Sequence, residues 1–145
     1  MNRFWVTCLA AAILLPASAA AENAIEPGQW KVTSNSQANG AAAPPQVKAI
    51  CLTNEQVSDL GKTFGPQMST VNSTCERTEY ESGGRQLKWR MQCKGQLDMD
   101  VSGNFQFDRP DHYTAVVTAK GWMAGAQVSD VKTEIEGARV GACPQ

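Results

Sequence analysis

The chain has 145 residues, of which 42% are hydrophobic and 19% are charged, and its formal net charge at pH 7 is −1. This length suits one domain with a hydrophobic core of its own. Because the basic residues are scattered and the net charge is close to zero, the composition excludes the basic footprint of a nucleic-acid-binding protein. We expect neither nucleic acid nor an anionic membrane surface as a partner.

Residues 1–21 have the layout of a cleaved secretory signal. A short positive region ending at Arg3 precedes an apolar run, residues 4–15, and a tract of small residues follows. The run is too short to span a bilayer, and cleavage after Ala19 or Ala21 satisfies the small-residue rule equally well. No later segment is apolar enough to cross a membrane, so we expect a secreted mature protein.

The cysteines indicate an oxidising compartment. Cys8 leaves with the signal, and its place inside the apolar run does not suit a lipid-modified cysteine. The mature chain keeps Cys51, Cys75, Cys93 and Cys143. An even count behind a signal peptide is typical of two structural disulfides, and no C-x-x-C suggests a redox or zinc site. We therefore expect residues 22–145 to form a single disulfide-bonded β domain, periplasmic in a Gram-negative envelope or secreted.

Two strands and one helix are expected in the first half of the mature chain. The strands are predicted around Trp30 and over residues 46–52, separated by a segment rich in Ser, Asn, Ala, Gly and Pro. Thr53 and Gln56 have the spacing of a capping box, which begins a helix of two to three turns. Its apolar residues at helical spacing are Val57, Leu60 and Phe64.

The stretch from residue 85 to residue 143 shows strict alternation of apolar and polar residues, which is typical of strands with one buried face. With the polar strand before it, this stretch predicts strands over residues 74–81, 86–94, 97–107, 112–120 and 127–140. The predicted fold is mainly β, an antiparallel meander of about seven strands. We expect it to curl into an open or closed barrel, with one short helix covering an end or an edge.

A two-residue turn at Gly83 and Gly84 predicts the register of the first hairpin in this stretch. That register places Cys75 opposite Gln92, so a bridge from Cys75 to Cys93 would need a β-bulge. The remaining pairings are 51–75 with 93–143, or 51–93 with 75–143. We favour Cys51–Cys75 with Cys93–Cys143, because this pairing ties the helical segment locally and fixes the C-terminus to a central strand.

Several short motifs resemble a known family. They are Pro27-Gly28-x-Trp30 near the mature start, Cys51-Leu52-Thr53 before the helix, the two mid-chain cysteines, and Gly141-x-Cys143-Pro144 at the end. Their order is similar to that of a family of uncharacterised small exported proteobacterial proteins, a domain of unknown function. The resemblance covers nearly the whole mature chain and implies a periplasmic, disulfide-bonded β protein. It brings no established catalytic residues.

Few polar residues suggest chemistry. His112 follows Asp108 and Asp111, an arrangement that suits a general base or a metal ligand, but aspartate is also a routine turn residue. Asp98 and Asp100 share one face of a strand, where paired carboxylates do acid–base work, bind calcium or simply face water. We favour an exposed turn and a solvated strand face. The sequence therefore predicts no catalytic residue, no cofactor and no metal.

Large apolar side chains are the remaining candidates for a site. The predicted ligand-binding residues are Trp30, Trp89, Met91, Phe105 and Trp122. On an inner face they would line a cavity for an apolar ligand, or they would fill a solid core. Trp122 belongs to a glycine-flanked loop that is expected to plug the sheet end or to anchor a partner.

Our first hypothesis is a non-enzymatic protein that binds an apolar small molecule or lipid in a β cup. The alternative is a protein-interaction module or inhibitor that contacts an envelope protein through an exposed edge or the Trp122 loop. Enzymatic activity is the least favoured hypothesis, because no catalytic motif is found in the sequence.

Overall fold

The computed structural model describes residues 23–67 and 73–145, so the predicted signal peptide lies outside the described residues. Eight strands and two short helices are found in this part of the chain. In chain order they are β1 (Gly28–Ala38), β2 (Ala41–Ala42), β3 (Gln46–Leu52), α1 (Asn54–Ser58), α2 (Leu60–Phe64), β4 (Ser73–Gly83), β5 (Gln86–Gly95), β6 (Asp98–Arg109), β7 (His112–Met123) and β8 (Ala126–Gly141).

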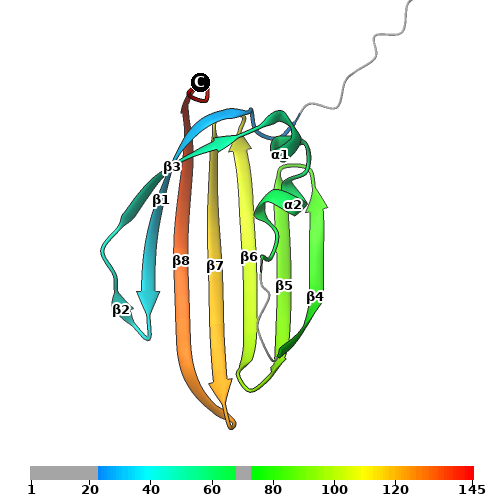
Figure 1. Cartoon of the computed structure of the whole chain (residues 1–145), viewed down its shortest axis with the longest axis vertical. Coiled ribbons are helices and arrows are strands. Elements are labelled where there is room, and N and C mark those ends of the chain that lie inside the picture. Colours follow the sequence, from blue (N-terminus) through cyan, green and yellow to red (C-terminus); the bar gives the residue numbers. More distant parts are fainter. Residues whose placement is uncertain (1–22, 68–72) are drawn as a thin grey trace, which may run out of the picture.

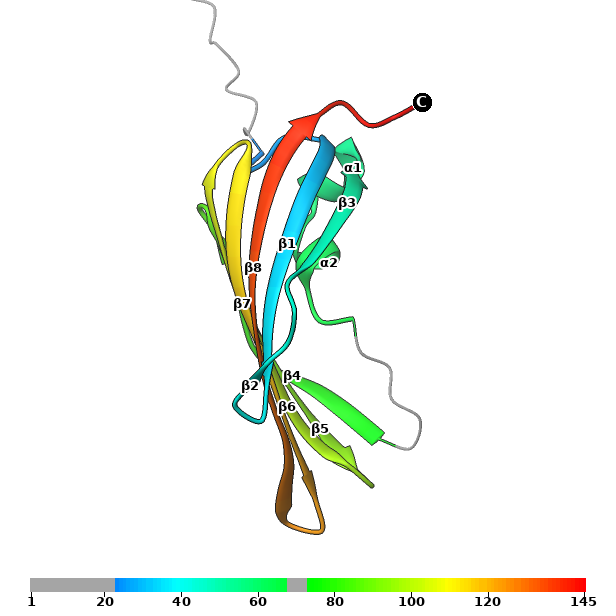
Figure 2. The ribbon, with the colours of Figure 1, turned by 90° about the vertical axis from the view of Figure 1, so that its left-hand side faces the viewer.

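The strands form one antiparallel sheet in the order β2-β1-β8-β7-β6-β5-β4, and β3 pairs with β1 outside this path. The meander predicted from β4 to β8 is confirmed, and β1 joins it by pairing with the last strand. Within the described residues β3 pairs only with β1 and β4 only with β5, so the sheet is open rather than a closed barrel. Figures 1 and 2 show the sheet bent around the two helices, which lie on its concave face.

The helical segment begins with the predicted capping box. The Gln56 backbone N–H donates to Thr53 Oγ1, and the Thr53 backbone N–H donates to Gln56 Oε1. The segment differs from the prediction because Asp59 interrupts it. The Asp59 side chain accepts a hydrogen bond from the Lys62 backbone N–H at 2.9 Å and so caps a second helix. Each helix has only 5 residues, so the pair covers a short length of the sheet.

The core lies between these helices and the upper part of the sheet, where β7 begins and β6 ends. Phe64 of α2 packs against Phe105, Phe107 and Tyr113, with ring centroids 5.2 to 5.7 Å apart. These aromatic contacts join the helix to the two central strands of the sheet. The buried hydrophobic cluster consists of Ile25, Trp30, Leu52, Val57, Leu87, Trp89, Val101, Phe105, Phe107, Tyr113 and Ala115.

The predicted disulfide pairing is wrong. The cysteines form Cys75–Cys93 and Cys51–Cys143 instead of Cys51–Cys75 and Cys93–Cys143. The predicted turn lies one residue too early, because Gly83 pairs with Gln86 and the two-residue loop is Gly84 and Arg85. A register shift between Arg77 and Glu79 then brings Cys75 directly opposite Cys93, with 3.9 Å between their Cα atoms. The sequence indicated that a Cys75–Cys93 bridge would need a β-bulge, and this register shift supplies it.

The second disulfide joins strand β3 to the chain just after the end of β8, two segments that are not neighbours in the sheet. Cys51 lies opposite Gln29, and Gln29 lies opposite Gly141 at the end of β8. The bridge from Cys51 to Cys143 therefore crosses β1, with 5.5 Å between the Cα atoms. It fixes the edge strand β3 and the C-terminal end of β8 on both sides of β1.

Candidate functional site

An apolar surface remains partly exposed on the concave face, next to the buried core. We call it the lower inner face, and it consists of Met99, Val117, Ala119, Val131 and Ile135. Each of these side chains is partly exposed, although it lies on the same side of the sheet as the buried core residues. Higher on the same strands, the inward residues that pack beneath the helices are at most 5% exposed.

The register of the strands explains why these residues lie together. Ala119 is opposite Val101 on β6 and Val131 on β8, and Val117 is opposite Thr133. The inward positions of β6 and β7 carry no charged side chain from Met99 to Phe107 or from Tyr113 to Gly121. Placing a charged group beside an apolar ligand costs free energy, because the charge loses its contact with water. A surface without charged side chains is therefore compatible with an apolar ligand.

A few polar groups border the lower inner face. Ser36 Oγ and Thr133 Oγ1 lie 2.9 Å apart, and these two hydroxyls bond to each other across β1 and β8. Lys48 on the edge strand β3 is exposed and pairs in register with Val32. A mostly apolar surface with few polar groups at its margin has the chemistry of a small-molecule site.

Four of the five predicted ligand-binding residues are on the inner face and are buried. Trp30, Trp89, Met91 and Phe105 are 0%, 6%, 6% and 5% exposed. The indole N–H of Trp30 donates to the Glu26 carbonyl at 3.2 Å, and that of Trp89 donates to the Phe64 carbonyl at 2.9 Å. All four side chains therefore belong to the buried core.

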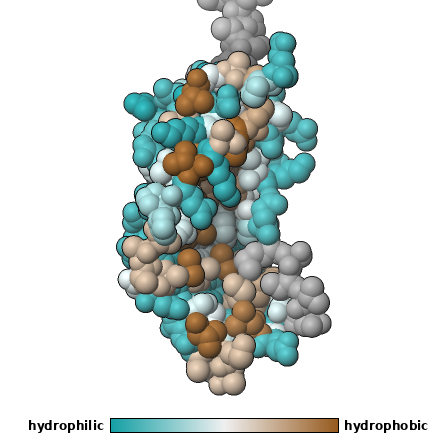
Figure 3. Space-filling model, turned by 60° about the vertical axis from the view of Figure 1, so that its left-hand side comes forward, coloured by the Kyte–Doolittle hydropathy of each residue, from teal (hydrophilic) through white to brown (hydrophobic). Residues whose placement is uncertain are grey.

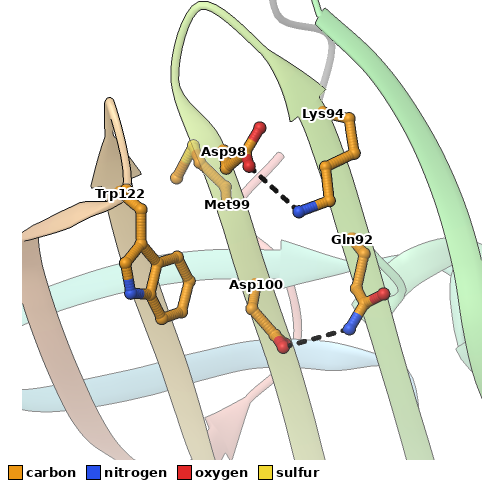
Figure 4. A pocket seen from close by; sticks show the side chains of 7 residues that line it. Gln92, Lys94, Asp98, Met99, Asp100 and Trp122 are labelled. Carbon is orange, nitrogen blue, oxygen red and sulfur yellow. Dashed lines mark hydrogen bonds and ion pairs between the residues drawn. The ribbon is translucent and has the colours of Figure 1, made fainter.

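Trp122 is separated from the other four residues. It belongs to strand β7 rather than to the predicted loop, because the turn consists of Ala124 and Gly125. It pairs with Asp98 on β6 and points to the convex side of the sheet, so it does not plug the sheet end. Figure 4 shows its indole reaching toward Asp100 beside a hollow on that face.

The hollow beside Trp122 has a volume of about 340 Å³. It is lined by Gln92, Lys94, Asp98, Met99, Asp100, Trp122 and Gly125. Asp98 accepts hydrogen bonds from Lys94 Nζ at 3.0 Å and from the Gly95 backbone N–H at 3.2 Å, and these bonds lower the pKa of its carboxyl. Both aspartates predicted to share a strand face therefore line one hollow.

Asp100 is held by a planar ion pair. Arg90 Nε donates to one carboxylate oxygen at 2.8 Å, and Arg90 NH2 donates to the other. Gln92 Nε2 adds a third hydrogen bond at 3.3 Å. The bond from Arg90 lowers the pKa of the Asp100 carboxyl, and the pair raises the pKa of Arg90. A permanently ionised pair in a bidentate geometry is suited to structure rather than to proton transfer.

His112 lies between two carboxylates. Its Nδ1 is 2.6 Å from Asp108 Oδ1, and its Nε2 is 3.2 Å from Glu136 Oε1. The hydrogen bond with Asp108 is the main cause that raises the pKa of the imidazole. Asp111 instead pairs with Arg109 at 3.2 Å. With a carboxylate at each nitrogen, the protonated ring is favoured, and it links β7 to β8.

In residues 23–67 and 73–145, no three His, Cys, Asp or Glu side chains gather closely enough to hold a metal ion. No helix in the described part of the chain is long and apolar enough to cross a membrane. The lower inner face and the hollow beside Trp122 are thus the two surfaces that we consider as candidate sites.

The comparison with protein families confirms one part of the resemblance, that the chain contains a domain of unknown function. The model of a family described as "Protein of unknown function (DUF3617)" matches residues 25–143. No curated protein and no solved structure gives a significant match to the chain. Since the family model covers all eight strands, both helices and all four cysteines of the two bridges, the chain belongs to the DUF3617 family of proteins of unknown function.

Proposed function

We propose that this protein is an exported, periplasmic, non-enzymatic protein that binds an apolar small molecule or lipid on its lower inner face. The observation that carries the proposal is the partial exposure of apolar side chains on a concave, uncharged part of the sheet. Concave apolar surfaces with few polar groups are the usual form of small-molecule sites.

The distribution of exposed apolar residues favours a lipid or another long apolar molecule. Met123 and Val128, at the end of the β7–β8 hairpin, are 54% and 49% exposed. Figure 3 shows apolar residues gathered at this lower end of the molecule. Beyond a register shift at Gly121, the inward positions of the hairpin are Ala119 opposite Val131 and Val117 opposite Thr133, with Ile135 further along β8. A long acyl chain would gain roughly 0.8 kcal/mol for each methylene buried along such a path.

Export is supported by the pattern of residues 1–21 and by two disulfides that need an oxidising compartment. The family resemblance of the motifs supports a proteobacterial periplasm. The absence of enzymatic activity is part of the same proposal. The ionised groups near the hollow are paired with each other, and His112 has a carboxylate at each ring nitrogen.

Extraction of the purified protein with organic solvent tests the proposal. The protein should be exported to the periplasm of a Gram-negative host, purified without detergent, extracted, and analysed by mass spectrometry. We expect one lipid class in a constant ratio to protein and enriched over the periplasmic extract. A protein without any enriched apolar molecule, which also fails to bind a fluorescent fatty acid, would contradict the proposal.

A further inference from the structure

The convex face of the sheet carries a second surface that apolar ligand binding does not use. The hollow beside Trp122 adjoins another of about 390 Å³, and both are lined by Asp100. Residues that line this second hollow include Lys88, Arg90, Ser102, Asn104, Thr118 and Lys120. We propose that these joined hollows bind a neutral oligosaccharide, with one sugar ring resting on the indole of Trp122.

The charges of the hollows are already balanced within the protein. Each cation that lines them lies within 4.0 Å of a carboxylate. These pairs are Lys88–Glu81, Arg90–Asp100, Lys94–Asp98 and Lys120–Asp130. An ionic ligand would have to compete with these internal pairs for its partner. A neutral ligand does not disturb them, and the paired groups still offer donors and acceptors.

The polar groups are held in fixed positions, as recognition of hydroxyl groups requires. Asp100 is fixed by Arg90 and Gln92, and Asp98 by Lys94 and the Gly95 backbone N–H. All these side chains project from paired strands, which hold a site more rigidly than loops do. A carboxylate oxygen has several lone-pair directions, so each aspartate can accept a further hydrogen bond from a sugar hydroxyl.

Trp122 supplies the apolar part of the site. Trp30 and Trp89 donate their indole N–H groups to backbone carbonyls, whereas no described residue accepts one from Trp122. Its ring is partly exposed beside the hollow, with Asp100 close to it in Figure 4. The face of an indole is electron-rich and attracts the weakly positive C–H groups of a pyranose ring. An aromatic surface beside fixed planar hydrogen-bonding groups is suited to a sugar ring, which is apolar on its faces and polar at its edge.

The volumes agree with an oligosaccharide rather than with a larger partner. Small-molecule sites start at roughly 300 Å³, and each hollow is just above this size. A stable protein partner would need about 800 Å² of contact on each side. The surface around these hollows is densely charged, which interfaces of that kind avoid at their centres.

A glycan array and a calorimetric titration test this inference. The exported wild-type protein is applied to an array of neutral and acidic oligosaccharides, and the neutral glycan with the strongest signal is then titrated in solution. We expect Trp122→Ala to weaken its binding by at least about tenfold, because the stacking surface is lost. Met123→Ala is the matched control, since it changes the neighbouring exposed residue, which does not line the hollow. It should change affinity by less than about twofold.

A second variant tests the polar part of the site without removing the ring. Gln92→Ala deletes the amide beside Asp100 and should also weaken binding, while the melting temperature stays close to that of the wild type. Absence of binding to every neutral glycan, binding to acidic glycans alone, or equal affinity of Trp122→Ala and wild type would each overturn the inference. The hollows lie on the convex face and share only Met99 with the lower inner face, so the Trp122 and Gln92 variants test the sugar site separately from the proposed apolar ligand.

Discussion

The disulfide between Cys51 and Cys143 offers a quantitative test of the fold. Replacing both cysteines by alanine removes a link between residues separated by 92 positions in the sequence. In the chain-entropy model, closing a loop of this length in the unfolded state contributes about 4.6 kcal/mol to stability. Cys51 is exposed and Cys143 is only partly buried, so little packing is lost with the sulfur atoms. We therefore expect the free energy of unfolding to fall by about 4 to 5 kcal/mol.

Urea denaturation followed by tryptophan fluorescence measures this change. Val47→Ala is the control, because Val47 is on the same edge strand, is 58% exposed and takes no part in a bridge. It should change stability by less than about 0.5 kcal/mol. A double variant that loses less than about 2 kcal/mol would refute the assigned link across β1. Peptide mapping without reduction should find Cys75 joined to Cys93, and any other pairing would refute the register of the first hairpin.

Two further predictions concern close contacts within the sheet. Gly103→Ala should destabilise the protein by about 1 to 3 kcal/mol in urea denaturation, since the new Cβ would lie 2.5 Å from the Trp89 ring. Gly83→Ala is its control, because its Cβ would meet nothing within 4 Å, and equal losses would contradict the packing. His112→Gln should lower the melting temperature more at about pH 5.5 than at about pH 8.5. The reason is that the folded protein raises the pKa of His112, so the protonated ring stabilises the fold below the unfolded pKa of roughly 6.5. This stabilisation is lost as the pH rises through the folded pKa. His112 is the only histidine of the chain, so its NMR signals can be followed without ambiguity. Their titration should show a pKa above that of a free histidine, and an equal or lower pKa would contradict the pairing with Asp108.

The alternation of residues was sufficient to predict the sheet but not the register of its first hairpin. Two glycines at Gly83 and Gly84 allow the turn to start at either one, and only Gly84 has a positive φ, of 59°. The bulge beside Thr78 has no glycine to mark it. Moving the turn by one residue shifts the partner of Cys75 by two, from Gln92 to Lys94, and leaves Cys93 on the other face. The bulge between Arg77 and Glu79 then shifts the register by one residue and brings Cys75 opposite Cys93, so the missed bulge led to the wrong disulfide pairing.

Trp122 was misplaced for a related reason. Gly121 and Gly125 on its two sides favoured a loop in the sequence, but only Gly125 belongs to the turn. Gly121 is a buried strand residue, and a Cβ there would lie 2.6 Å from Ser129 Oγ. A glycine in a strand often marks the close approach of another chain segment or a bulge, and the register shifts between Gly121 and Trp122.

The sequence indicated an uncovered part of the inner face only through the difference in length between the predicted helix and the predicted strands. A helix of two to three turns is roughly 15 Å long, whereas a strand of 12 residues extends roughly 40 Å. One short helix therefore cannot cover the apolar face of such strands. The alternation predicted which side chains point inward, but their exposure depends on where the helices lie in three dimensions.

Binding of a fluorescent fatty acid to a matched pair of variants tests the proposed function most directly. Val117 and Val116 are neighbours on β7 that point to opposite faces of the sheet, and only Val117 belongs to the lower inner face. Both proteins should first be shown to be folded by circular dichroism. We predict that Val117→Asp abolishes binding, because it places a charge beside the apolar ligand, and that Val116→Asp retains the wild-type affinity. Equal binding by the two folded variants would contradict a ligand site on the lower inner face.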